Sequence, residues 1–438
     1  MLDVIDARQI PVDANFVLPR ADFSVDAAMP GVIAICEAVR SRGTDALAEF
    51  SNQFDHVVPA NFAVPKAAID QAVADLDPQV RAAIQTAIDR RRLVCQQLET
   101  EPAQRFIDVA PGARIGYRIE PVGRVGLYVP GGLAPLASSV LMNAVPAQVA
   151  GVGSIAVASS PRPEFGGLPH PVILGVAGLL GLTEVYAVGG AQAIAMFAYG
   201  VPGVCQPVDL VTGPGNIYVA AAKRHLHGVV GIDSEAGPTE IAILADDSAD
   251  PAFLAADLVS QAEHDPLAGA VLVTDSADLA EAVRRQVDHL VSVHPLRPRL
   301  EASLGGHQSA VLLVNDIEQG IAVVDAYAAE HLEVVTRDAA KVAGRVRNAG
   351  AIFVGPYSPV PLGDYAAGST HVLPTGGTAR FASGLMVRSF TKAMHVIEYD
   401  EPALDELAQA LTTFALAESL PGHAGAITAR TGGEGMTS

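Results

Sequence analysis

The chain contains no tryptophan, and aromatic residues make up only 5% of its 438 residues. Its three cysteines, Cys36, Cys95 and Cys205, lie far apart and form neither a C-x-x-C pair nor a disulfide framework. Isolated cysteines are typical of a reducing compartment, so we expect a cytoplasmic protein. Because large rings are scarce, Ala, Val, Leu and Gly must build the core, which favours α/β layers with close contacts between helices and sheets.

Basic residues are also scarce: 28 Lys and Arg stand against 48 Asp and Glu, a net charge of −20. This balance argues against nucleic acid or an anionic membrane as a partner, because binding phosphates requires a basic surface. It leaves room for an anionic cofactor, which helix N-termini can hold. Apolar runs such as Pro171–Leu182 are shorter than the roughly 20 residues of a membrane helix. The N-terminal residues are too acidic and too interrupted for a signal peptide.

A chain of this length predicts two or three domains. Between Val125 and Val208 only Arg162, Glu164 and Glu184 are charged. Strands that are buried on both faces read as continuous apolar runs, and a parallel sheet covered by helices produces such runs. The pattern predicts an inserted α/β domain over 121–236, with strands at Val125–Val129, Ile155–Ala158 and Val185–Val188 and helices at Val172–Leu182 and Ala191–Tyr199.

A larger α/β domain is predicted from 23–120 together with 237–381. Its first part contains two helical stretches, and its second part alternates strands and helices, which again indicates a mostly parallel sheet. One of the predicted helices runs from Ile321 to His331. Residues 1–22 are predicted to be an N-terminal arm with little core, and 382–438 a C-terminal appendage or dimerisation segment. The predicted fold class is therefore α/β, with two parallel-sheet domains and terminal segments.

Glycine-rich turns recur in the charge-poor region. Pro130-Gly131-Gly132 follows a predicted strand, Gly189-Gly190 leads from a strand into a helix, and Gly213-Pro214-Gly215-Asn216 precedes a helical run. Such turns let the backbone approach a pyrophosphate at a helix N-terminus. None of the three is a G-x-G-x-x-G motif, so each alone is explained equally well as a tight connection.

Several polar residues are candidate metal ligands. Gln261 and His264 are three residues apart in a predicted helix, which places them on one face. With Asp364, in a long glycine-rich loop, and His423 they offer two imidazoles, a carboxylate and an amide oxygen, a mixed set that suits Zn²⁺ and can also accept Mn²⁺ or Co²⁺. Taken singly, a histidine at a helix end or an aspartate in a loop is more often structural. The spacing alone does not bring Asp364 and His423 near Gln261.

Glu330 and His331 form an adjacent pair at the predicted end of a helix. A carboxylate beside an imidazole provides two groups that can move protons near neutral pH. The alternative interpretation is a histidine favoured by the helix dipole next to an exposed glutamate. The pair by itself does not distinguish catalysis from this structural role.

At these residues the chain resembles the histidinol dehydrogenase family over nearly its whole length. The resemblance is carried by ordered motifs, namely V-G-L-Y-V-P-G-G (Val125–Gly132), S-S-V-L-M-N-A-V-P-A (Ser138–Ala147), G-G-A-Q-A-I-A (Gly189–Ala195), G-P-G-N (Gly213–Asn216), S-Q-A-E-H (Ser260–His264), A-E-H-L-E (Ala329–Glu333), G-D-Y-A-A-G-S-T-H-V-L-P-T (Gly363–Thr375) and P-G-H-A (Pro421–Ala424).

The resemblance implies a zinc- and NAD-dependent oxidation of L-histidinol through an aldehyde to L-histidine, the last step of histidine biosynthesis. It implies two incomplete Rossmann-like domains and a homodimer with shared active sites, one Zn²⁺ per subunit. The residues that it implies are Gln261, His264, Asp364 and His423 as zinc ligands, Glu330 and His331 as the catalytic pair, Tyr128, Gln192 and Asn216 as NAD contacts, and Thr239, Gln261, His264, His331, Asp364, Glu418 and His423 around the substrate.

Two features depart from the family pattern. Thr239 occupies a position that is commonly serine, which keeps the hydroxyl and adds a methyl group, and Glu235 adds a carboxylate close by. Because of these two features, a related zinc- and NAD-dependent dehydrogenase that acts on another amino alcohol or polyol stays an alternative function. A zinc hydrolase with Glu330 as its base, and a two-domain binding protein without chemistry, are further alternatives from other functional classes.

Overall fold

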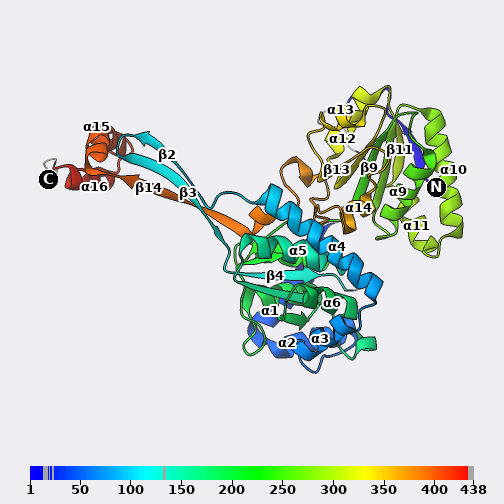
Figure 1. Ribbon diagram of the computed structural model, residues 1–438, viewed down its shortest axis with the longest axis horizontal. Helices are drawn as coiled ribbons and strands as arrows, with labels where there is room; N and C mark the ends of the chain where they lie inside the picture. Colours follow the sequence, from blue (N-terminus) through cyan, green and yellow to red (C-terminus); the bar gives the residue numbers. More distant parts are fainter. Residues whose placement is uncertain (13–17, 19, 22–23, 132–134, 433–438) are drawn as a thin grey trace. The chain divides into compact units, whose positions relative to one another are not determined.

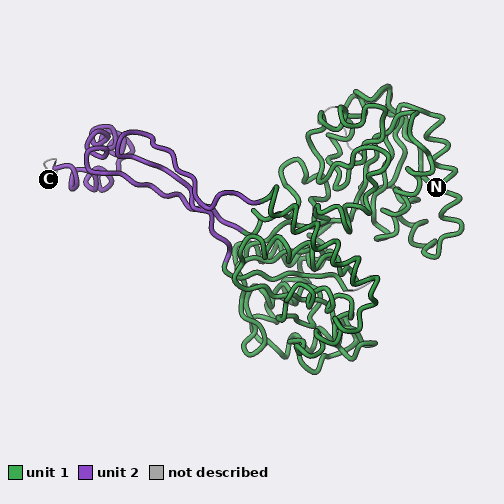
Figure 2. Tube along the Cα trace, in the orientation of Figure 1, with its two compact units in different colours: residues 1–99, 123–390 green, residues 100–122, 391–438 purple. Residues whose placement is uncertain are grey.

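The computed structural model describes residues 1–12, 18, 20–21, 24–131 and 135–432. The chain forms two compact units (Figure 2). Unit 1 comprises Met1–Glu99 and Gly123–Phe390, and unit 2 comprises Thr100–Val122 and Thr391–Ser438. Each unit is built from segments that are distant in the sequence.

Unit 1 contains a six-stranded sheet, here called sheet A, whose strands are all parallel. Its order is β1-β11-β10-β9-β12-β13. The central strands are almost entirely apolar and buried on both faces, as is usual for a parallel sheet. The strands are β1 (Asp3–Asp6), β9 (Glu240–Ala245), β10 (Gly269–Thr274), β11 (Ala310–Leu313), β12 (His331–Val335) and β13 (Ala351–Val354).

Helices bury their apolar faces in two separate cores of sheet A (Figure 1). One core contains side chains of α9 (Pro251–Ala262), α10 (Ala277–Val293), α11 (Arg297–Leu304) and α14 (Val360–Tyr365). The other contains those of α12 (Ile317–Tyr327) and α13 (Ala339–Ala343). Helix α9 begins sharply because Pro251 occupies its first turn and the Asp250 side chain accepts a hydrogen bond from the Ala252 amide.

A second parallel sheet of unit 1, sheet B, has five strands in the order β6-β5-β4-β7-β8. The strands are β4 (Arg124–Val129), β5 (Ser154–Ser159), β6 (Val185–Ala187), β7 (Leu210–Thr212) and β8 (Gly231–Ile232). The helices that follow them are α5 (Ser138–Ala150), α6 (Pro171–Leu179), with the short η3 (Pro163–Phe165) before it, α7 (Gly190–Tyr199) and α8 (Ile217–Leu226).

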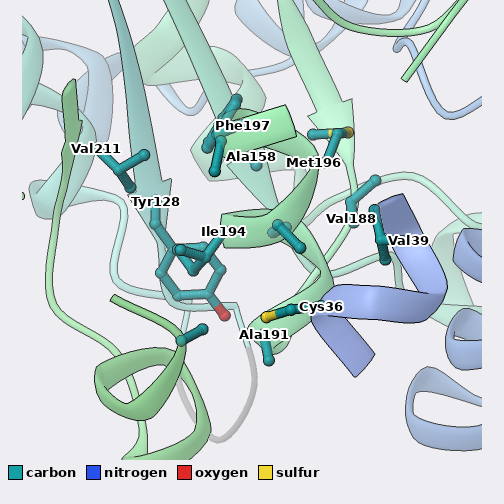
Figure 3. Packing of buried hydrophobic residues seen from close by; sticks show 14 of the residues in the cluster. Cys36, Val39, Tyr128, Ala158, Val188, Ala191, Ile194, Met196, Phe197 and Val211 are labelled. Atoms are coloured by element: carbon teal, nitrogen blue, oxygen red, sulfur yellow. The ribbon is translucent and has the colours of Figure 1, made fainter. Parts of the chain in front are cut away.

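One core of sheet B is formed with the N-terminal helices (Figure 3). Cys36 and Val39 pack in the same cluster as Tyr128, Ile194 and other small apolar residues. The N-terminal helical elements are α1 (Val25–Arg42), α2 (Thr44–Phe50), η1 (Ser51–Asp55), α3 (Lys66–Ala74), α4 (Pro78–Val94) and η2 (Cys95–Glu99).

The predicted α/β fold class with two parallel sheets is confirmed. The domain assignment differs in four places. Thr100–Val122, predicted to be divided between the two α/β domains, belongs to unit 2. The helices of 25–50 pack on sheet B rather than in the larger domain, because an amphipathic pattern reveals a buried face but not its partner. The first residues are part of sheet A rather than a separate arm, since Asp3–Asp6 pairs with β11. Residues 382–390 belong to unit 1 with the short helices η4 (Thr378–Arg380) and η5 (Val387–Phe390).

Unit 2 contains an antiparallel sheet in the order β14-β3-β2 and two helices. Its elements are β2 (Gln104–Ala110), β3 (Ala113–Pro121), β14 (Thr391–Tyr399), α15 (Glu401–Ala417) and α16 (Pro421–Thr431). The buried apolar side chains in its described residues are Ala113, Ala403 and Ala424. Three alanines make a very small core for a unit of this size.

None of the helices in the described part of the chain combines the length and the apolar character needed to cross a membrane.

Candidate active site

Glu330 directly precedes β12 and His331 is its first residue, so the pair does not lie at the end of a helix as predicted. Helix α12 ends at Tyr327, and Ala328 adopts a left-handed conformation with φ of 52°, which turns the chain away from the helix axis. His331 then begins β12, which pairs in parallel with β9. The pair is therefore presented at the amino end of sheet A.

The Glu330 side chain is buried and held by β9 and the residue before it. One carboxylate oxygen, Oε2, accepts a hydrogen bond from the Thr239 hydroxyl at 2.6 Å and another from the Glu240 amide at 2.9 Å. Burial raises the pKa of Glu330 to about 8 despite these two hydrogen bonds, and the negative charge of Asp364 adds to the increase. At pH 7 the carboxyl group in this environment keeps its proton.

The His331 ring is buried beside Glu330. Its Nδ1 lies 3.3 Å from the Glu240 carbonyl oxygen, and Nε2 has no hydrogen-bond partner among the described residues. Burial lowers the pKa of His331 below its usual value, although the charge of Asp364 opposes this. The imidazole is therefore neutral at pH 7, and a neutral ring with one uncommitted nitrogen is suited to accept a proton.

Gln261 is connected to the same network. Its amide nitrogen donates to the Thr239 hydroxyl at 2.5 Å, while its buried oxygen Oε1 has no hydrogen-bond partner in the part of the chain that is described. A buried amide oxygen without a donor is costly unless something else coordinates it. The orientation of Gln261 thus matches that of a metal ligand with an oxygen donor.

His264 and Asp364 approach the same place. His264 lies just beyond the end of α9, where its Nδ1 faces the carbonyl oxygens of Ser260 and Gln261 at 3.1 and 3.2 Å. Its Nε2 is 3.9 Å from one Asp364 carboxylate oxygen, and the other oxygen is 3.9 Å from Nε2 of His331. The carboxylate therefore lies between the two imidazoles.

An imidazole, a carboxylate and an amide oxygen are together a donor set that fits Zn²⁺. No group of three or more His, Cys, Asp and Glu side chains within the described residues is arranged to hold a metal ion. The third candidate ligand at this site is the amide oxygen of Gln261, a residue type outside those four. Glu418 and His423, the remaining predicted residues, belong to unit 2, at the end of α15 and the start of α16. Their roles stay predictions.

The glycine turns stand at the carboxyl ends of sheet B strands. Gly131 and Gly189 each lie two residues after the last residue of β4 and of β6, and Gly213 directly follows β7. Gly213 has φ of 111°, and a Cβ atom there would come within 2.1 Å of the Tyr128 carbonyl oxygen. Asn216 caps α8 with hydrogen bonds from the amides of Tyr218 and Val219. Gly132, also predicted in these turns, lies outside the described residues.

A cavity of about 90 Å³ adjoins the Gly213 turn and Glu330, and it is also lined by Thr239, His371 and Thr375. The Tyr128 and Gln192 side chains are buried, at 4% and 1% exposure, and the Tyr128 hydroxyl accepts a hydrogen bond from the Gly190 amide. The predicted contacts of Tyr128, Gln192 and Asn216 with NAD stay predictions.

Two residues that hold the Gly213 turn, Lys223 and Asp233, are not among the predicted site residues. The buried Lys223 ammonium donates to the Gly213 carbonyl oxygen at 2.5 Å and to Asp233 at 2.6 Å, and the Gly213 amide donates to Asp233 at 2.8 Å. The available signal was a lysine that directly follows three alanines in the charge-poor helical run, because a buried lysine needs a partner.

Comparison with known proteins decides the family. The model described as Histidinol dehydrogenase matches residues 18–431. The chain is 63% identical to the histidinol dehydrogenase of Cutibacterium acnes, over 98% of this chain and 99% of that protein, and 58% identical to that of Thermobifida fusca, over 97% of each. A crystal structure of histidinol dehydrogenase from Elizabethkingia anophelis superposes with a TM-score of 0.92 at 30% identity, covering 98% of each chain.

The chain belongs to the histidinol dehydrogenase family. The predicted resemblance is thereby confirmed, and the chain is an oxidoreductase that acts on an alcohol. Membership in this enzyme family argues against the alternative of a two-domain binding protein without catalytic activity.

Hydrogen bonds link Gln261 to Thr239 and Thr239 to Glu330, and they predict the effect of replacing Thr239. Replacement by valine keeps the shape but leaves the Gln261 amide without its acceptor and removes a donor from Glu330, so we expect a loss of about 1–3 kcal/mol in the free energy of unfolding. Replacement by serine keeps the hydroxyl and should cost clearly less. Urea unfolding of both variants measures the difference, and equal losses would contradict the hydrogen-bond chain.

Proposed function

We propose that the protein oxidises L-histidinol to L-histidine in two steps, with Zn²⁺ and NAD⁺ as cofactors, as the last step of histidine biosynthesis. The observation that carries the proposal is the convergence of the unpartnered Gln261 oxygen, His264 Nε2 and the Asp364 carboxylate beside the buried pair Glu330 and His331. The names of the related proteins supply the substrate.

Gln261, His264 and Asp364 would hold the zinc ion, with His423 as the fourth protein ligand. When bound, Zn²⁺ would orient histidinol through its imidazole and amine nitrogens, and NAD⁺ would accept a hydride in each of the two oxidations. Orientation of the alcohol carbon is the main contribution of the metal in this proposal, and Lewis acidity is secondary.

The protein side chains move the protons. His331, neutral and with Nε2 uncommitted, accepts the hydroxyl proton as the alcohol becomes the aldehyde. The carboxylate form of Glu330, whose share grows as pH rises towards 8, then removes a proton from a water molecule that adds to the aldehyde carbon. His331 returns its proton to the aldehyde oxygen, which yields the hydrated aldehyde and a neutral imidazole. His331 accepts the second hydroxyl proton as that hydrate becomes the carboxylic acid. Both groups act as bases, so protonation of either one stops the step that it serves.

The active protein is a homodimer in this proposal, with unit 2 packed on a second copy. Leu407, Leu411 and Phe414 recur at helical spacing on α15 and are exposed, Phe414 by 67%. On the sheet, Ile107 and Ile397 lie on either side of Ile115 in the strand register, and both are about two-thirds exposed. Apolar surface of this extent around so small a core is typical of a surface that is covered in an oligomer.

Removal and return of the metal tests the reaction as a whole. Protein treated with a chelator should lose NADH formation from histidinol, and added Zn²⁺ should restore it, with two NADH formed per histidinol consumed. Absorbance of NADH measures both quantities. Turnover of an ester or amide without NAD⁺ would instead support a zinc hydrolase, and preference for another amino alcohol in a substrate panel would support the related dehydrogenase.

The two catalytic assignments predict different kinetic effects. His331→Asn should slow both oxidations, by roughly 10²–10⁴-fold as expected for loss of a general base. Glu330→Gln should mainly slow the conversion of aldehyde to acid. Single-turnover measurements with histidinol and with the aldehyde separate the steps. A Glu330→Gln variant that loses the alcohol step and keeps the aldehyde step would reverse the assignment.

Shared active sites predict complementation between inactive variants. In a mixture of Asp364→Asn and His423→Asn, one of the two sites in each mixed dimer pairs an intact unit 1 with an intact unit 2, so roughly a quarter of full activity should return after random mixing. A mixture of Asp364→Asn and His264→Asn, both in unit 1, is the matched control and should stay inactive. No recovery in the first mixture, with subunit exchange demonstrated by mass spectrometry, would mean that His423 acts within its own chain.

A further inference from the structure

Three elements of unit 1 carry the proposed base and two of the proposed ligands: Gln261 is the penultimate residue of α9, His331 is the first residue of β12, and α14 contains Asp364. The same three elements are also in contact through a pair of carboxyl groups that the proposed reaction does not use. The pair consists of Asp257 on α9 and Glu333 on β12.

Glu333 joins β12 to α14. Its side chain is buried at 2% exposure, and its Oε1 accepts a hydrogen bond from the amide of Val360 at 3.0 Å. Val360 is the first residue of α14, whose N-cap residue, Pro359, provides no side-chain cap. Glu333 thus supplies from a neighbouring strand the acceptor that the first turn of the helix lacks.

Glu333 also joins β12 to α9 through a hydrogen bond with the Asp257 carboxyl group. Two carboxyl groups can share a hydrogen bond only if one of them keeps its proton. Burial raises the pKa of Glu333 to about 9, and the charge of Asp257 contributes to this increase. Burial raises the pKa of Asp257 to about 6. The pair therefore shares one proton near neutral pH.

The spacing connects each member of this network to the site. Asp257 precedes Gln261 by four residues on α9, so both side chains lie on one helix face. Glu333 follows His331 by two residues on β12, so both point to one face of the sheet. Val360 precedes Asp364 by four residues, one turn of α14. A shift of the pair would move all three site residues.

We propose that Asp257 and Glu333 are positioning residues, whose shared hydrogen bond fixes α9, β12 and α14 in the register that lets Gln261, His331 and Asp364 converge. This inference rests on the proposed function for its consequence in zinc binding, but the register itself can be measured without any ligand.

Asp257→Ala and Glu333→Leu break the pair in two independent ways, and Glu333→Gln preserves it. Glutamine can accept from the Val360 amide with its oxygen and donate to Asp257 with its nitrogen, as the protonated glutamic acid does. Amide hydrogen exchange of 360–365 is the first measurement. Exchange should accelerate in both disrupting variants and stay near that of the unsubstituted protein in Glu333→Gln.

Zinc affinity by equilibrium dialysis with the metal alone is the second measurement. The disrupting variants that retain a cooperative thermal transition should bind zinc roughly 10–100-fold more weakly, as is usual when an outer partner of a ligand is lost. Glu333→Gln should restore the affinity. Unchanged exchange in Asp257→Ala, or equal loss in Glu333→Gln and Glu333→Leu, overturns the proposal. If the unsubstituted protein binds no zinc, the proposed function fails while the exchange data still decide the positioning role.

The shared proton provides a third measurement. Glu333 has a raised pKa in the folded protein, so its contribution to stability is present below its ordinary pKa and is lost as pH rises through about 9. The melting temperature of the unsubstituted protein should therefore fall from neutral pH to pH 9 more than that of Glu333→Gln, whose amide does not titrate. Within the described structure, Asp257 and Glu333 are the titratable groups that change each other's pKa. Helix α14 contributes only the Val360 amide, which does not titrate. Parallel pH profiles would argue against a shared proton.

Discussion

The site depends on keeping the carboxyl group of Glu330 buried, which is costly unless donors are already in place. The start of β9 supplies them: the Thr239 hydroxyl and the Glu240 amide both reach one oxygen of Glu330, and the Glu240 carbonyl oxygen faces His331. Parallel pairing of β9 with β12 brings these groups into register. The backbone of a single residue, Glu240, thereby orients both members of the pair.

The two sheets of unit 1 contribute opposite ends of their strands. Glycine turns stand at the carboxyl ends of sheet B, the usual location of ligand sites in open α/β sheets. Glu240 and His331 instead begin their strands at the amino end of sheet A. A strand start exposes backbone groups that a flanking side chain can use, whereas the middle of a strand commits them to its neighbours. This explains why the buried polar groups collect there.

Sequence reasoning was most effective where one physical signal dominated. Continuous apolar runs predicted three strands of sheet B, β4, β5 and β6, to within one residue at each end. It misplaced the end of α12, because buried polar residues in His331–Val335 obscure the alternation that marks a strand. It could not assign the helices of 25–50 to sheet B, nor find the Lys223 contact with Asp233, because both depend on contacts between distant segments.

The strand pairing of unit 2 constrains the order in which the chain can fold. Strand β3 is synthesised before most of unit 1, but its neighbour β14 is synthesised only after the last segment of unit 1. Until then, β2 and β3 form a lone hairpin, which is marginally stable in water. A nascent chain that stops short of Tyr399 therefore leaves an open strand edge on β3 that is prone to wrong pairing.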